Sequence, residues 1–396
     1  MQTEKLGEAA AQTGTLRNMR ICNELIPLYR LWPRRRASDN AQSAPTGIRM
    51  RDIMTNSQKH TLQRLLSTCC SAEECRGLLR SVRVPASILE QAGEEVSRAV
   101  LAQALNLALV RELLMRVPTG KQYVDEHVSQ GRQIVFDHGA LRTVDLDGMG
   151  DLPAGGRAIT RLLLPLGYRL GAVYPLDRLG MTGRSYTHVD FPEDLPQFFV
   201  SELHPERFSP GFQLTVSRIA ASSRDPLSGL AKGALHDIEL RGALPFDQAS
   251  RLLPELLACF RRQHATPRLS DYQVLLVESP EMAWIATEGN AFNHATDRVH
   301  LLEALVSQQR RLGRPLKDTV EISRSGRVRQ TAYRADLVER EFIDFDGSIV
   351  RHSVPGSFFE FIQRERVHDP ATGVARLDLA FDTGNAQGIF KMTAAA

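Results

Sequence analysis

Two short segments of the chain share a pattern of residues that could do chemistry. Residues 136–144 read Phe-Asp-His-Gly-Ala-Leu-Arg-Thr-Val, and residues 292–299 read Phe-Asn-His-Ala-Thr-Asp-Arg-Val. Each copy therefore carries a His, at His138 and His294, with an Arg four residues later. A neutral imidazole is a ligand for Fe(II), Zn or Cu, and a guanidinium offers a planar, permanently charged fork to a substrate carboxylate. The repeat predicts a metal pocket with an Arg, such as Arg142, facing into it.

A strand-like segment with one Glu follows each copy at a similar distance. Glu202 lies 64 residues after His138, and Glu360 lies 66 residues after His294. Two His and one carboxylate form the ligand set of non-haem Fe(II) oxygenases, which leaves open positions for substrate and dioxygen. The pattern thus offers four candidates for three places. Internal symmetry alone allows either Glu to complete the site, and Glu202 also fits a supporting position behind the ligands.

The two copies share an expected order of elements, which is strand, helix and then three strands. Such a repeat predicts an α+β fold built from two βαβββ modules. In the first copy, β-prone residues lead into His138, a helix is expected over 155–164, and strands are expected over 168–174, 185–191 and 197–203. In the second, the corresponding ranges are a strand from 282–285 leading into His294, a helix over 301–312, and strands over 319–323, 328–335 and 358–362.

The rest of the chain reads as helical additions to these modules. Apolar residues recur at helical spacing over 61–79, 86–115 and 246–263. We therefore expect five regions along the chain. They are a disordered extension over 1–53, an N-terminal helical region over 54–130, module one over 131–205, a helical insertion over 206–270, and module two with a C-terminal tail over 271–396.

Composition excludes several classes of function. The formal net charge is +3, from 49 basic and 46 acidic side chains, so the chain shows no electrostatic footprint for nucleic acid. No apolar run is long enough for a membrane helix, and the N-terminus lacks the apolar core of a secretory signal. The five Cys are odd in number and lack paired zinc spacing. A reducing, cytoplasmic compartment is therefore expected.

Several motifs resemble the family of 2-oxoadipate dioxygenase/decarboxylase. The resemblance extends over roughly residues 60 to 396 and is carried by the segments 136–144, 289–299, 329–332, 354–361 and 388–390. It implies a fold of the vicinal oxygen chelate type, in which two βαβββ modules form an open β-barrel around a metal. This agrees with the duplication found from the residues themselves.

The resemblance also implies roles for individual residues. His138, His294 and Glu360 match the iron-binding residues of the family, and it is the resemblance that favours Glu360 over Glu202. Arg142 matches the Arg that grips the substrate, so His138 and Arg142 are expected to lie against it. The implied reaction takes 2-oxoadipate and dioxygen to 2-hydroxyglutarate and carbon dioxide, late in lysine breakdown. Iron and manganese both accept this ligand set.

Two other functions fit the same paired modules. One is a metal-dependent isomerase or lyase of the glyoxalase kind, which would not consume dioxygen. The other is a non-catalytic protein that sequesters a small molecule, which would bind no metal. In that case His138→Ala would leave ligand binding intact.

Overall fold

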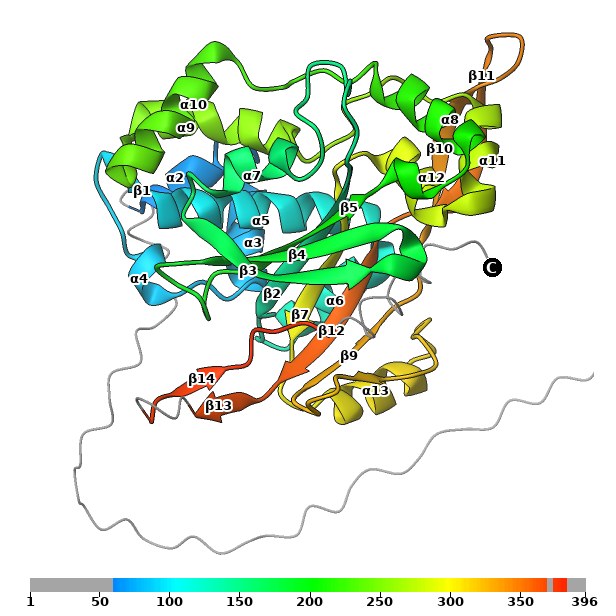
Figure 1. Ribbon diagram of the computed structural model, residues 1–396. Coiled ribbons are helices and arrows are strands. Elements are labelled where there is room, and N and C mark those ends of the chain that lie inside the picture. Colours follow the sequence, from blue (N-terminus) through cyan, green and yellow to red (C-terminus); the bar gives the residue numbers. More distant parts are fainter. Residues whose placement is uncertain (1–59, 369–372, 383–396) are drawn as a thin grey trace, which may run out of the picture. The chain divides into compact units, whose positions relative to one another are not determined.

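An eight-stranded curled sheet organises the protein, whose computed structural model describes residues 60–368 and 373–382 (Figure 1). The strand order is β3-β4-β5-β2-β7-β12-β9-β8. The predicted extension over 1–53 lies outside the described residues. No helix in the described ranges combines the length and apolarity needed to cross a membrane.

The predicted duplication is visible in the topology of this sheet. Module one contributes β2 (Phe136–Val144), α7 (Arg157–Leu163), β3 (Tyr168–Leu176), β4 (Met181–His188) and β5 (Gln197–Leu203). Module two contributes β7 (Phe292–Arg298), α13 (Leu302–Arg311), β8 (Glu321–Ile322), β9 (Val328–Ala332) and β12 (Phe358–Arg364). In each module the first and last strands are parallel neighbours. The modules meet where β2 and β7 pair antiparallel, which confirms an α+β fold of two βαβββ units.

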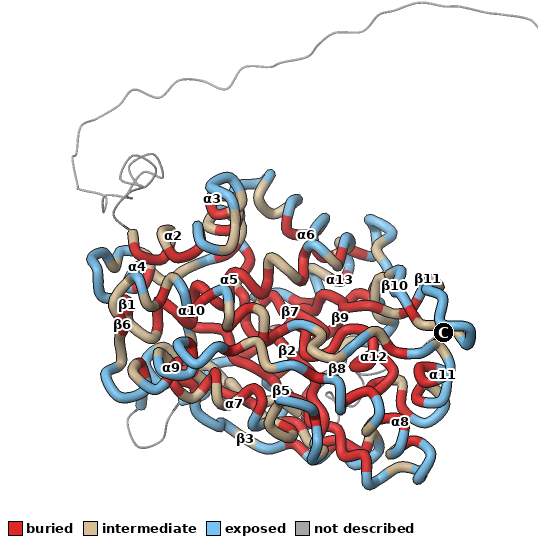
Figure 2. The backbone as a smooth tube through the Cα atoms, turned by 90° about the horizontal axis from the view of Figure 1, so that it is seen from above, coloured by how far each residue is buried: buried red, intermediate tan, exposed pale blue. Residues whose placement is uncertain are grey.

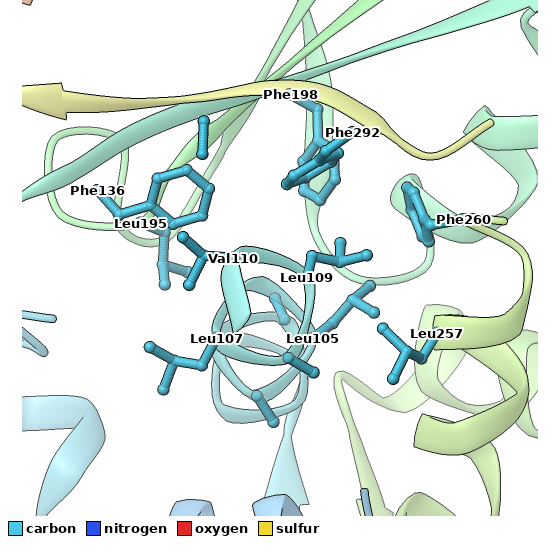
Figure 3. Close-up of a cluster of buried hydrophobic side chains, with 14 of the residues drawn as sticks. Leu105, Leu107, Leu109, Val110, Phe136, Leu195, Phe198, Leu257, Phe260 and Phe292 are labelled. Atoms are coloured by element: carbon cyan, nitrogen blue, oxygen red, sulfur yellow. The ribbon is translucent and has the colours of Figure 1, made fainter. Parts of the chain in front are cut away.

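Helices cover the sheet and complete two hydrophobic cores. On one face lies α5 (Arg98–Arg116), whose leucines pack against Phe136, Phe198 and Phe292 from three different strands (Figure 3). Figure 2 shows α5 and the central strands as largely buried. The opposite face of the sheet joins a second core with α8 (Pro210–Ala220), α11 (Leu269–Glu278) and α12 (Pro280–Glu288).

The remaining elements are short helices and two-stranded pairs. The helices are α2 (Thr61–Leu66), α3 (Ala72–Ser81), α4 (Ala86–Leu89), α6 (Pro118–Ser129), α9 (Gly229–Arg241) and α10 (Phe246–Ala258). The paired strands are β1 (Glu95–Ser97) with β6 (Ala243–Pro245), β10 (Leu337–Ile343) with β11 (Ile349–Pro355), and β13 (Arg366–His368) with β14 (Ala375–Leu377).

Some predicted elements were wrong. Residues 282–285 do not form a strand but lie within α12, which begins with Pro280 and is capped by the side chain of Ser279 on the backbone N–H of Met282. The helix predicted over 86–115 is two helices separated by β1, where Gly93 takes a φ of 119°. The helix predicted over 61–79 is likewise split into α2 and α3. The hairpin of β10 and β11 was not predicted.

Candidate active site

The two repeated His residues meet across the seam between the modules. Because β2 and β7 are antiparallel, His138 is paired with Thr296, and His294 is paired with Ala140. The two Nε2 atoms lie 3.4 Å apart. Glu360 on β12 places Oε2 at 3.2 Å from Nε2 of His138 and at 3.4 Å from Nε2 of His294. All three side chains are buried, and their arrangement could hold a metal ion.

A β-bulge precedes each His. In the β2–β7 ladder the register shifts between Phe136 and His138 and again opposite Asn293, so that Asp137 and Asn293 are the extra residues. A bulge directs two successive side chains towards one face of a strand. It therefore lets Asp137 contact the ring of His138, and Asn293 contact the ring of His294, although each pair is adjacent in sequence.

The two candidate Glu residues are not equivalent in the fold. Glu360 pairs with Thr296, two residues after His294. The corresponding position in module one, two residues after His138, is Ala140, and its partner on β5 is Phe199. Glu202 lies three residues further along β5 and so faces the opposite side of the sheet. The symmetry that allowed either Glu to complete the site was therefore misjudged from spacing.

Glu202 has a structural partner instead. Its Oε1 accepts from Arg184 at 2.6 Å, and its other oxygen accepts the backbone N–H of Gly156. Glu202 also lies close to Asp145 and His204. Arg184 already forms an ion pair with Glu202, which distinguishes Glu202 from Glu360.

The polar groups around Glu360 leave a place for a cation. Thr296 donates to Oε2 of Glu360 at 2.6 Å, and its hydroxyl oxygen lies 3.1 Å from Nε2 of His138. The other oxygen, Oε1, is buried and has no hydrogen-bond partner in the described part of the chain. A buried carboxylate oxygen without a partner is costly. A cation bound by Glu360, His138 and His294 would remove that cost, so the residues fit a metal.

Outer partners orient both imidazoles. Nδ1 of His138 donates to Asp137 at 2.8 Å, and Arg364 holds the same carboxylate through Nε and Nη2 at 2.9–3.1 Å. This chain of contacts fixes the proton on Nδ1 and turns the Nε2 lone pair of His138 into the site. The amide of Asn293 lies 3.1 Å from Nδ1 of His294. A half-turn of that amide would present its oxygen to Nδ1–H and give His294 the same tautomer.

Burial and neighbouring charges set the protonation of these groups. Burial lowers the pKa of His294 to about 3, with a contribution from nearby His138 and Arg142. Burial works against the charged form of His138, but its hydrogen bonds to Asp137 and Glu360 outweigh this and raise its pKa. Burial likewise opposes ionisation of Glu360, yet the two imidazoles keep its pKa below the usual range. A negative carboxylate beside imidazoles is the state that ligates metals.

Arg142 lies on the same strand as His138 and is fully buried. Burial lowers its pKa to about 10, so the guanidinium remains charged at neutral pH. It lies over the ring of Trp284 at 5.0 Å, and Glu281 is a nearby carboxylate. The corresponding Arg298 of module two serves another purpose, because it lies 3.6 Å from Asp137 and donates to the carbonyl of Glu193.

Aromatic rings enclose the site. Phe358 lies 4.9 Å from the ring of His294, and Phe381 meets the ring of His138 edge-on at 4.8 Å. Phe381 comes from the C-terminal segment, which is held in place by the hydroxyl of Tyr174 and by Arg364, whose Nη1 donates to the carbonyls of Asp378 and Ala380. The site thus has an aromatic ring beside each imidazole.

The sequence analysis did not identify Thr296, Arg364 or Phe381. Thr296 could have been found, because it lies two residues after His294 and so must share its face of the strand. Arg364 could also have been found, since it lies four residues after Glu360 and so on the same face of the strand. Phe381 carries no local signal, because only the tertiary path of the C-terminal segment brings it to His138.

Comparison with known proteins agrees with this geometry. A rice protein named 2-oxoadipate dioxygenase/decarboxylase, chloroplastic/amyloplastic, is 25% identical over 337 residues, which cover 78% of this chain and 82% of the relative. A solved structure from Ralstonia eutropha JMP134, described as a glyoxalase superfamily protein, is 52% identical with a TM-score of 0.77, covering 82% of this chain and 99% of that one.

The fold is also that of rice hydroxyglutarate synthase, which was solved in complex with 2-oxoadipate. That structure has a TM-score of 0.58 at 21% identity, covering 79% of this chain and 95% of the other. Finally, residues 95–390 match the family described as 2-oxoadipate dioxygenase/decarboxylase, which is most of the chain. The protein therefore belongs to the 2-oxoadipate dioxygenase/decarboxylase family.

Proposed function

We propose that the protein is an Fe(II)-dependent dioxygenase that oxidatively decarboxylates and hydroxylates a 2-oxo acid. The proposed substrate is 2-oxoadipate, and the products are 2-hydroxyglutarate and carbon dioxide, as in the last steps of lysine breakdown. The observation that carries the proposal is the buried group of His138, His294 and Glu360, with one carboxylate oxygen left without a partner among the described residues. Membership of a family of such enzymes supports it.

His138, His294 and Glu360 would hold the metal, which would supply chelation of the 2-oxo acid and activation of dioxygen when bound. Asp137 keeps a proton on Nδ1 of His138, which leaves Nε2 as a donor of electrons. Arg364 keeps Asp137 ionised, since its guanidinium lowers the pKa of this buried carboxyl. The metal site thus depends on residues that never touch the metal.

Arg142 would orient the substrate. A dicarboxylic 2-oxo acid has a second carboxylate at its far end, and a buried guanidinium can bind it through two hydrogen bonds. With His138 on the same strand, Arg142 would align the substrate along β2. Phe358 and Phe381 would exclude water from the reacting end.

Dioxygen uptake tests the proposal. The protein is purified without oxygen, loaded with Fe(II), given 2-oxoadipate, and its products are identified by mass. Uptake that matches 2-hydroxyglutarate formation and is lost in His294→Ala would support both reaction and site. Loading with Mn(II) instead distinguishes the two metals that accept this ligand set.

Other outcomes discard parts of the proposal. Metal bound through the three residues without any uptake would keep the site and remove the substrate. Turnover of another substrate without dioxygen would indicate an isomerase or lyase. Ligand binding that survives His138→Ala in a protein that takes up no metal would indicate a sequestering protein.

We also propose a cytoplasmic location. It rests on cysteine use, because Cys69, Cys70, Cys75 and Cys259 are all free thiols. Fractionation of cells with an antibody against the protein tests this, and recovery in an oxidising compartment or an organelle would contradict it.

A further inference from the structure

A groove rich in arginine lies apart from the candidate active site. We call it the arginine groove, and its cavity has a volume of about 570 Å³. It shares no residue with the group of His138, His294 and Glu360. Its lining includes five Arg but only three Glu. The arginines are Arg116, Arg261, Arg262, Arg340 and Arg351.

Carboxylates already neutralise three of these five cations. Arg340 binds Glu288 through two hydrogen bonds of 2.6 and 2.8 Å. Arg351 pairs with Glu341 at 2.8 Å, and Arg261 pairs with a glutamate of α5 at 2.5 Å. Arg116 and Arg262 form no ion pair within the ranges that the structure describes. In the part of the chain that the structure describes, Arg116 and Arg262 are thus the two cations of the groove without a carboxylate in direct contact.

Both of these cations have donors left over. Arg116 gives one bond, from Nη2 to the carbonyl of Phe292 at 3.2 Å, while its Nε is buried without a partner in the described residues. Arg262 gives one bond, from Nη2 to the hydroxyl of Thr266 at 3.2 Å. A guanidinium has five N–H donors. Neutral acceptors thus use only a small part of the N–H donors of Arg116 and Arg262.

Burial also makes the two charges costly. It lowers the pKa of both Arg116 and Arg262, and the neighbouring Arg340 lowers each of them further. Glu288 works in the opposite direction on both. An anion bound in the groove would offset this cost of burial and accept the unused donors of both side chains.

We propose that the arginine groove binds a compact dianion, of dicarboxylate or phosphate type, between Arg116 and Arg262. Both chemistries present paired oxygens that match the planar fork of arginine. The groove opens to solvent over the start of β7 and the hairpin of β10 and β11, so a small metabolite can enter without passing the active site. This ligand is separate from the substrate of the proposed reaction, and its binding does not depend on that reaction.

Calorimetric titration of the full chain tests the inference. Inorganic phosphate and glutarate are the two probes, at fixed ionic strength and in metal-free protein, with acetate as a monoanion control. We expect saturable binding of at least one dianion and weak or no binding of acetate. The double variant R116Q/R262Q should weaken that binding about tenfold or more, since each lost charge-assisted hydrogen bond is worth roughly that much.

Two further variants control the result. R241Q removes the same charge from an exposed helix outside the groove and should leave binding unchanged. H294A alters the candidate active site and should also leave it unchanged, which excludes glutarate bound there. Equal weakening in R241Q, loss of binding in H294A, or unchanged binding in R116Q/R262Q would each overturn the proposal, as would a wild-type protein that binds neither probe.

Discussion

The two modules are alike in backbone but differ in what they give to the candidate site. Each offers a His on its first strand, preceded by a bulged polar residue that contacts the ring. On the last strand, however, module two has Glu360 where module one has Phe199. A fully symmetric site would have a second carboxylate at the position of Phe199, which we call the fourth place. This place is apolar, and the ring of Phe199 packs there 5.0 Å from the ring of Phe381.

With a metal bound as proposed, this difference would explain how a duplicated fold obtains an open coordination site. Two equal halves would supply two His and two carboxylates and would surround a cation. An aromatic ring in place of one carboxylate would leave three ligands on one side of the metal and an apolar surface on the other. The proposed substrate would then occupy the space that symmetry would have filled. Four experiments break or sharpen this comparison.

The largest effect is expected from Glu360→Gln. The variant should lower the affinity for Fe(II), or for Mn(II) as a stand-in, by more than about a hundredfold, because losing a ligand costs more than losing an outer partner. Metal content after dialysis measures it. The matched variant Glu202→Gln, on the equivalent strand of module one, should keep its metal. An equal loss of metal in both variants would contradict the assignment of Glu360 alone to the metal site.

Restoring the symmetry is expected to be costly. Phe199→Glu would place a carboxylate against the aromatic rings of Phe381 and Tyr174. Without metal we expect the free energy of unfolding to fall by about 3 kcal/mol or more. Urea denaturation of the metal-free protein measures this. A variant as stable as the wild type would contradict the expectation that position 199 requires an apolar side chain.

The outer partners of the two His should differ in importance. Asp137→Asn removes a charged acceptor that Arg364 also needs, and we expect metal affinity to fall by about ten- to a hundredfold. Asn293→Ala removes only a neutral partner and should cost less. Competition with a chelating dye measures both affinities. A larger loss of metal affinity in Asn293→Ala than in Asp137→Asn would contradict this prediction.

The last comparison concerns pH and the His residues of the two modules that lie outside the site. Burial lowers the pKa of His188 on β4 to about 4, whereas the described His of module two outside the site are exposed. Between pH ~6.5 and ~4 the unfolded chain therefore binds more protons than the folded one. Stability should be complete above this window and should fall as pH drops through it, by at most about 1.4 kcal/mol per pH unit. Urea midpoints of His188→Gln should show a weaker acid dependence than those of the wild type.

The repeated motif was enough to predict the two βαβββ units, because His138 and His294 each lie on the first strand of one unit. It could not predict the bulges at Asp137 and Asn293, because a single extra residue in a strand leaves no recognisable pattern in the sequence. The equivalence of Glu202 and Glu360 failed for a related reason. Side chains alternate along a strand, so a spacing that differs by a few residues decides which face the carboxylate reaches.

Local preference also misled the element assignment in one place. Residues 282–285 include a Trp and an Ile, which favour strands, yet Ser279 and Pro280 start a helix there. Local sequence preferences cannot predict the position of the segment around Phe381. It reaches His138 through hydrogen bonds from Arg364 to Asp378 and Ala380, which depend on the completed fold.

The antiparallel seam between β2 and β7 has a consequence for the durability of the protein. A metal held by His138 from one half and by His294 from the other would cross-link positions 156 residues apart in sequence. Such a link behaves like a reversible staple, which restricts the unfolded chain and adds stability when it is closed. Metal supply would then govern lifetime as well as activity. In a cell short of the metal, the halves would separate more readily along this seam and become targets for proteases.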